Sequence, residues 1–325
     1  MQIKLHIGFH KCGSTALQFA MAQSRSALAA AGVVYPSAHC VLDAHHRLAW
    51  SLSGRKIPGF DNIPAEQLFE AWLAEAVAQQ AEMMVLSSED FEFLAPPAVE
   101  RLGKLLQGHQ VEIYVYLRPQ DEYLIAEYKQ HVRMMDTAFG GTIDEFYARY
   151  LYEMSVRFDY PEIVGRWADR FGIDRVKVTS YYRPGLIDGD ILADFAAAGG
   201  LPAFAMPSAR EHNVTWTNLT TLIFAKLNVI GFSPETRVAL SRDLDLVVAQ
   251  KQLEVELLTA AKRNALISKH RASNAKLLAA YQVRGDAGRL LDREIAPGVP
   301  QDETAAINAV LLQFIADVIC RAPPS

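Results

Sequence analysis

The stretch LHIGFHKCGST (residues 5–15) decides the predicted fold and most of the predicted function. An apolar pattern that begins just before it, at Ile3, predicts a buried strand, which leads through a glycine-bounded loop into a helix starting near Ser14. The N–H groups of such a loop and of the helix's first turn point at one anion, and the helix dipole adds partial positive charge. The sequence therefore predicts a phosphate-binding loop between Gly8 and Ser14.

The position of the lysine separates this loop from that of the nucleoside triphosphatases. The pattern here is G-x-x-x-x-G-S-T, one residue away from G-x-x-x-x-G-K-[ST]. Ser14 stands where the triphosphatase lysine would reach the β- and γ-phosphates, and Lys11 lies inside the loop instead. A plainer interpretation is a strand–turn–helix junction that uses Gly13 for its backbone conformation and binds nothing.

The loop resembles the 5′-phosphosulfate loop, P-K-[ST]-G-[ST]-[ST], of sulfotransferases that use 3′-phosphoadenosine 5′-phosphosulfate (PAPS). Four residues match that pattern: Lys11, Gly13, Ser14 and Thr15. His10 and Cys12 replace the usual proline and Ser/Thr. The resemblance implies that Lys11 approaches the oxygen bridging phosphate and sulfate. The segment from Cys12 to Thr15 would then hold the 5′-phosphate.

A second candidate phosphate ligand follows the apolar run VEIYVYL (residues 111–117). The run predicts a strand that ends at Arg118, and ligands of open α/β sheets bind beyond the carboxyl ends of strands. The segment resembles the family's 3′-phosphate region, in which an arginine and a serine two helical turns later hold the phosphate. Arg118 matches, but Ala126 stands at the serine position, where Lys129 could compensate. Alternatively, Arg118 pairs with Asp121 or Glu122 and Lys129 lies on a solvated helix face.

The resemblance also implies a donor-site tyrosine and a general base. In the family a tyrosine near the end of a later strand lies beside the adenine, which makes Tyr181 a candidate. Sulfuryl transfer needs a base that takes the proton of the acceptor, usually a histidine or a glutamate. The candidates are His45, His46 and Glu89. The plain alternatives are a polar histidine pair on a surface loop and a carboxylate that caps a helix.

Composition restricts the remaining function classes. The chain has 325 residues, 50% hydrophobic and 21% charged, which is typical of a globular protein with a sizeable core. A net charge of −5 argues against a general nucleic-acid binder, and three scattered cysteines favour neither a zinc site nor a disulfide framework. No run approaches the ~18 apolar residues of a membrane span, and no signal-peptide pattern is present. We therefore expect a cytoplasmic protein without a metal ion.

Alternation of strand and helix patterns predicts the fold. Expected strands cover residues 3–8, 83–86, 111–117 and 176–179, and expected helices cover 14–31, 66–82, 96–106, 121–134, 161–171 and 190–198. This order predicts an α/β, P-loop-like three-layer core with a mostly parallel sheet over residues 1–205. The later helical patterns at 216–230, 234–264 and 302–320 predict a helical C-terminal subdomain over 206–325.

Taken with the resemblance, these features predict a sulfotransferase. It would move a sulfuryl group from PAPS to a hydroxyl, or an amine, of a saccharide or small-molecule acceptor. A nucleotide kinase and a nucleotide-binding protein without sulfotransferase activity are the alternatives. Ser14 argues against the kinase, and Ala126 makes the inactive binding protein conceivable.

Overall fold

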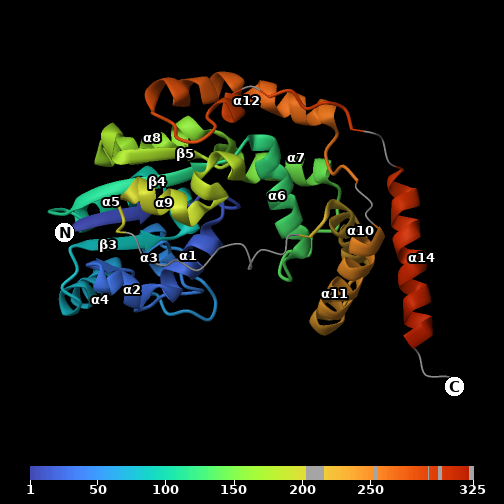
Figure 1. Ribbon diagram of the computed structural model, residues 1–325, viewed down its shortest axis with the longest axis horizontal. Coiled ribbons are helices and arrows are strands. Elements are labelled where there is room, and N and C mark those ends of the chain that lie inside the picture. Colours follow the sequence, from blue (N-terminus) through green and yellow to red (C-terminus); the bar gives the residue numbers. More distant parts are fainter. Residues whose placement is uncertain (203–215, 252–254, 292, 299–301, 322–325) are drawn as a thin grey trace. The chain divides into compact units, whose positions relative to one another are not determined.

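The computed structural model describes residues 1–202, 216–251, 255–291, 293–298 and 302–321 (Figure 1). The chain forms two compact units, each built from separate segments. Unit 1 comprises Met1–Pro119, Val156–Asn213 and His270–Asp292; unit 2 comprises Gln120–Ser155, Val214–Lys269 and Arg293–Ser325. The domain boundary predicted after residue 205 lies within 203–215, outside the described residues, and stays a prediction.

A five-stranded parallel sheet lies at the core of unit 1 (Figure 1). Its spatial order is β2-β3-β1-β4-β5, and every neighbouring pair runs parallel. The strands are β1 (Gln2–His6), β2 (Val33–Val34), β3 (Met83–Ser87), β4 (Gln110–Leu117) and β5 (Val176–Ser180). The predicted α/β class with a mostly parallel sheet is therefore confirmed, although the two-residue strand β2 was missed.

Both faces of the sheet are covered, as the near-continuous apolar character of its strands requires. On one face the ring of His6 in β1 meets the edge of Phe195, 5.9 Å away between centroids, in helix α9 (Ile191–Gly199). Leu5 points to the opposite face because strand side chains alternate, and it is fully buried as well. Helix α8 (Tyr160–Phe171) packs on β4 and β5. Unit 1 thus has helix, sheet and helix layers.

The helices expected in unit 1 are present, one of them with a break, whereas α3 and α13 were missed. The helices of this unit are α1 (Ser14–Gln23), α2 (Arg25–Ala30), α3 (His46–Ser53), α4 (Ala65–Ala78), α5 (Pro96–Leu105), α8 (Tyr160–Phe171), α9 and the short α13 (Gly288–Leu291). The single helix expected over residues 14–31 is interrupted at Ser24, whose ψ of 7° departs from helical geometry. The start of α9 is fixed by Asp190, whose side chain accepts the Leu192 N–H at 2.7 Å.

Unit 2 is helical in its described residues. It contains α6 (Gln120–Arg133), α7 (Ile143–Met154), α10 (Asn218–Ile230), α11 (Pro234–Lys251), α14 (Glu303–Arg321) and the first part of α12 (Ala260–Ala280), which continues into unit 1. The helix predicted over 234–264 is wrong in extent, since α11 ends at Lys251 and α12 starts at Ala260. None of the helices described is both long enough and apolar enough to traverse a bilayer.

The strand order reverses beside β1. After β1 the chain builds β2 and β3 on one side of it, and then crosses to form β4 on the other. Such a switch point opens a crevice at the carboxyl ends of the two central strands. β1 ends there in the loop that starts at Gly8, and β4 ends there in Arg118. The fold therefore brings both predicted phosphate-binding segments to one edge of the sheet.

Candidate active site

The loop after β1 has the backbone geometry of an anion-binding nest. Lys11 and Gly13 have φ angles of 61° and 81°, and Cys12 between them has a negative φ. Alternating φ signs turn successive N–H groups toward one side, which creates a concavity for an anion. Gly13 is also the N-cap of α1 and supplies no capping side chain, so the first turn keeps its N–H donors for a ligand.

The predicted loop ligands differ in accessibility. Cys12 is completely buried and donates its N–H to the Phe9 carbonyl at 3.2 Å, so its backbone closes the turn. Ser14 is buried, Lys11 is half-buried, and Thr15 is exposed. Lys11 adopts a left-handed conformation that is uncommon for a residue other than glycine and that clusters at ligand sites.

The segment after β3 packs directly against this loop. A Cβ placed on Gly8 would lie 2.9 Å from the Cα of Glu89, so only glycine permits this approach. Gly8 also has a φ of 98°, a conformation that favours glycine. Ser88 donates its N–H to the His6 carbonyl at 3.1 Å and continues the ladder beyond β3. Glu89 is thereby held beside the loop.

Arg118 and Tyr181 directly follow the carboxyl ends of β4 and β5, on the side of β1 away from β3. Tyr181 follows β5 and donates its N–H to the Leu117 carbonyl at 2.6 Å. The Arg118 guanidinium lies 5.0 Å from the centroid of the Tyr181 ring, within cation–π range. The Tyr181 hydroxyl would be 3.0 Å from a Cβ on Gly13. One tyrosine therefore contacts both predicted phosphate-binding segments.

The Arg118 charge makes the surroundings of Tyr181 electropositive. Burial raises the pKa of the Tyr181 hydroxyl, and the Arg118 charge acts in the opposite direction. The Nε of Arg118 is buried and has no hydrogen-bond partner among the described residues. A buried guanidinium N–H without an acceptor is costly, so this atom suits an anionic ligand.

His45 is a buried structural residue. Its ring lies edge-on between Tyr35 and Trp72, with centroids 4.8 and 4.9 Å away. Nε2 lies 3.2 Å from the Pro36 carbonyl, and Nδ1 accepts the Ser87 N–H at 3.1 Å. Burial lowers the pKa of His45 to about 3. Both ring nitrogens are engaged, so we favour the neighbouring histidine as the base.

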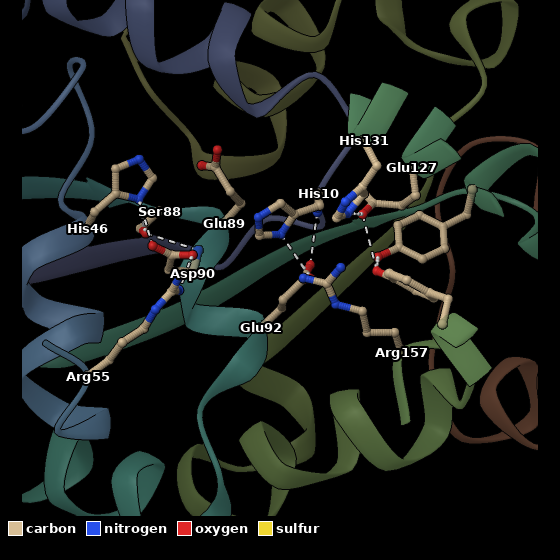
Figure 2. A network of polar contacts seen from close by, with 12 residues as sticks. His10, His46, Arg55, Ser88, Glu89, Asp90, Glu92, Glu127, His131 and Arg157 are labelled. Carbon is tan, nitrogen blue, oxygen red and sulfur yellow. Dashed lines mark hydrogen bonds and ion pairs between the residues drawn. The ribbon is translucent and has the colours of Figure 1, made fainter. Parts of the chain in front are cut away.

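His46 begins α3 and is oriented by two side chains that follow β3 (Figure 2). Its Nδ1 lies 2.8 Å from the Ser88 hydroxyl and 3.5 Å from a carboxylate oxygen of Asp90. The ring stacks on Trp50 with a centroid distance of 5.8 Å and an interplanar angle of 10°. A histidine held through one nitrogen by a hydroxyl and a carboxylate has the arrangement of an oriented general base.

Glu89 is the second base candidate that lies near the loop. Gln18 of α1 donates to its carboxylate at 2.7 Å. Burial by itself would raise the pKa of Glu89, but the charges of His46 and His10 and the Gln18 hydrogen bond lower it below the ordinary value. Figure 2 draws Glu89 together with both histidines. The carboxylate is therefore ionised at neutral pH and able to accept a proton.

His10, which replaces the family proline, anchors the loop to the segment after β3 (Figure 2). Its N–H donates to the buried Glu92 carboxylate at 2.9 Å, and its Nδ1 lies 2.9 Å from the other oxygen. Arg157 pairs with the same carboxylate at 3.0 Å and lies 3.9 Å above the ring of Phe93. His10 accordingly positions the loop.

Several of these supporting residues were missed in the sequence. They are Gln18, Trp50, Ser88, Asp90, Glu92 and Arg157. The acidic run after β3, SEDFE (residues 88–92), was an available signal, because polar side chains at a strand's carboxyl end commonly serve a site. Arg157 gave no such signal, since it is distant in sequence from both of its partners.

The other residues considered around Arg118 belong to unit 2. Asp121 is fully buried and forms ion pairs with Arg263, at 2.8 Å, and with Arg293. The Lys129 amine donates to the Trp216 carbonyl at 3.1 Å, so a backbone acceptor engages it. Ala126 is half-buried on the same helix, and its proposed equivalence to the family serine stays a prediction.

Comparisons with known proteins leave the family open. No protein-family model matches the chain. An uncharacterized protein of Archaeoglobus fulgidus is 28% identical over 204 residues, which are 61% of this chain and 53% of that protein. The chain thus spans about half the length of this curated relative. The solved structure of a sulfotransferase from Alicyclobacillus acidocaldarius matches with a TM-score of 0.43 and 16% identity, covering 73% of this chain and 98% of that one.

Proposed function

We propose that the protein is a sulfotransferase that moves the sulfuryl group of PAPS to a hydroxyl of a saccharide or small-molecule acceptor. The observation that carries this proposal is the position of Tyr181, whose hydroxyl lies against Gly13 and whose ring lies beneath the Arg118 guanidinium. Through this one side chain the two predicted anion-binding elements are joined. The loop sequence, with Lys11 in place of a lysine at position 14, favours a phosphosulfate over a triphosphate.

The residues present suit a donor with two separate phosphates. The nest around Lys11 and the first turn of α1 supply backbone donors for the 5′-phosphosulfate. Arg118 offers a buried, unpartnered Nε for the 3′-phosphate, and the fork of a guanidinium matches phosphate geometry. Tyr181 lines the same donor site.

The proposed transfer is a single in-line displacement. The acceptor oxygen forms a bond to sulfur while the bond from sulfur to the bridging phosphate oxygen breaks. Lys11 and the loop dipoles stabilise the charge that grows on the leaving phosphate. His46 takes the proton of the acceptor hydroxyl, oriented by Ser88 and Asp90, and Glu89 is the alternative base.

Calorimetric binding of nucleotides tests the proposal most directly. Adenosine 3′,5′-bisphosphate should bind at least tenfold more tightly than ATP with magnesium. The variant Arg118→Gln should lose this preference, whereas Arg101→Gln, an exposed arginine of α5, should keep it. Tighter binding of ATP would favour the kinase, and failure of both nucleotides to bind would overturn the proposal.

A further inference from the structure

A pocket of about 310 Å³ is formed by α3, the helix that begins at His46, and by the segment that follows it. Its volume is at the lower end of the range for small-molecule sites. The charged and aromatic residues that line the pocket are Arg47, Trp50, Arg55, Lys56, Phe60 and Asp61. None of these residues was among the site residues predicted from the sequence.

The pocket is electropositive. Its lining includes three cationic side chains and one carboxylate, that of Asp61. Lys56 is exposed, and no carboxylate of the described residues lies within ion-pair distance of it. The Nε of Arg47 is buried and lacks a hydrogen-bond partner among the described residues. In a chain with a net charge of −5, this local excess of positive charge favours an anionic ligand.

The pocket also presents aromatic surface. Phe60 is 40% exposed, and its ring centroid lies 5.4 Å from that of Trp50. The Arg47 guanidinium lies 5.3 Å from the Phe60 ring. Aromatic faces flanked by cations suit a molecule that has both a ring face and an anionic group.

The pocket and the proposed base share their supports. The Trp50 indole N–H donates to the Asp90 carboxylate at 2.5 Å, and the His46 ring stacks on the same indole. Arg55 lies 3.6 Å from the other oxygen of Asp90 (Figure 2). Trp50 therefore both lines the pocket and contacts His46.

We infer that this pocket binds the acceptor, and that the acceptor is an anionic molecule with an apolar ring face. The inference rests on the proposed function, because it takes His46 as the base. Two sources have this chemistry, an acidic sugar and an aromatic acid. In both, the anionic group pairs with Lys56 and Arg47, and the ring packs on Trp50 and Phe60.

Binding of simple probes without the donor tests this inference. Methyl β-glucuronide, benzoate and the uncharged methyl β-glucoside would be titrated by ligand-observed NMR. At least one anion should bind five or more times tighter than the glucoside. Its affinity should fall on raising the salt concentration, because exposed charges are screened. Binding of glucuronide alone would assign an acidic sugar, and binding of benzoate alone an aromatic acid.

Two variants and one control locate the binding. Lys56→Gln and Phe60→Ala should each weaken the anion at least fivefold, and Lys104→Gln, an exposed lysine of α5 outside the pocket, should not. Failure of both anions to bind, or equal binding by the two pocket variants and the control, would overturn the inference. Binding of adenosine 3′,5′-bisphosphate is measured on the same samples. If the bisphosphate does not bind, the result counts against the proposed function. If the bisphosphate binds and neither anion does, the result counts against the pocket alone.

Discussion

The hydroxyl of Tyr181 lies so close to Gly13 that a Cβ at this glycine would approach it to 3.0 Å. Gly13 comes from the loop after β1, and Tyr181 follows β5, two strands away in the sheet. The Tyr181 side chain therefore contacts the predicted anion-binding loop through its hydroxyl and the Arg118 guanidinium through its ring. Substitution at this contact should therefore affect the donor more than the fold.

Gly13→Ala should impair binding of adenosine 3′,5′-bisphosphate by at least tenfold. The new Cβ meets Tyr181 and Ile191 at 3.0 Å, in addition to the strain of a φ of 81°. Gly108→Ala is a matched control, since its φ is 87° and a Cβ there meets nothing within 4 Å. Both variants should lose about 1–2 kcal/mol of stability from the left-handed backbone. Equal affinity of the two for the bisphosphate would contradict the role of the contact.

Arg118→Ala should act on the 3′-phosphate selectively. The loss for adenosine 3′,5′-bisphosphate should be about 1.5–3 kcal/mol, the scale of a hydrogen bond to a charged group. Adenosine 5′-phosphate, which lacks the 3′ group, should bind nearly as before. Calorimetry with both nucleotides measures the difference, and equal losses would mean that Arg118 acts through the fold.

Lys11→Ala should lower kcat by ~100-fold or more while binding of the bisphosphate changes little. The contact between Lys11 and the leaving oxygen strengthens as this oxygen gains charge. The expected size of the effect is that of the loss of one oxyanion-hole donor. Single-turnover assays with labelled donor measure this, with Lys104→Ala as the control. A kcat within about threefold of the native value would exclude this role for Lys11.

Substitution of the three base candidates should give three different results. His46→Ala should lower kcat by ~100-fold, because the acceptor hydroxyl loses the group that takes its proton. His45→Ala should instead lower the melting temperature, since the buried Ser87 N–H loses its acceptor at a cost of about 1–3 kcal/mol. If Glu89→Gln abolishes turnover and His46→Ala does not, the carboxylate is the base.

Mild acid should destabilise unit 1 through its two buried histidines. Burial lowers the pKa of His6 to about 4 and that of His45 to about 3, whereas an unfolded histidine titrates near ~6.5. The unfolded chain therefore binds more protons below pH ~6.5, so stability falls as the pH is lowered. Each histidine contributes up to ~1.4 kcal/mol for each pH unit.

Thermal melts between pH 7 and pH 5 measure this effect above the range in which carboxylates titrate. His45→Gln should be less stable than the native chain at pH 7 but should show a shallower decline toward pH 5. A variant with the native slope would mean that His45 does not contribute to acid sensitivity.

The sequence by itself determined four of the five strands, their order along the chain and most of the helices that connect them, although α3 and α7 were not expected. The apolar run before Gly8, the alternating run before Arg118 and the intervening helical patterns are local signals, and they predict parallel strands whose carboxyl ends carry the site. The loop pattern with Lys11 and Gly13 is also local, so the turn between β1 and α1 could be predicted, and its binding of an anion stays a prediction. The short strand β2 was missed because two residues carry no periodicity.

The tertiary structure alone decided which candidates meet. His45 and His46 are neighbours in sequence, yet one is enclosed by Tyr35 and Trp72 and the other lies beside Ser88. Burial depends on what packs around a residue, and no local pattern carries that information. The contact of Tyr181 with Gly13 has the same origin, because it depends on the order of strands within the sheet.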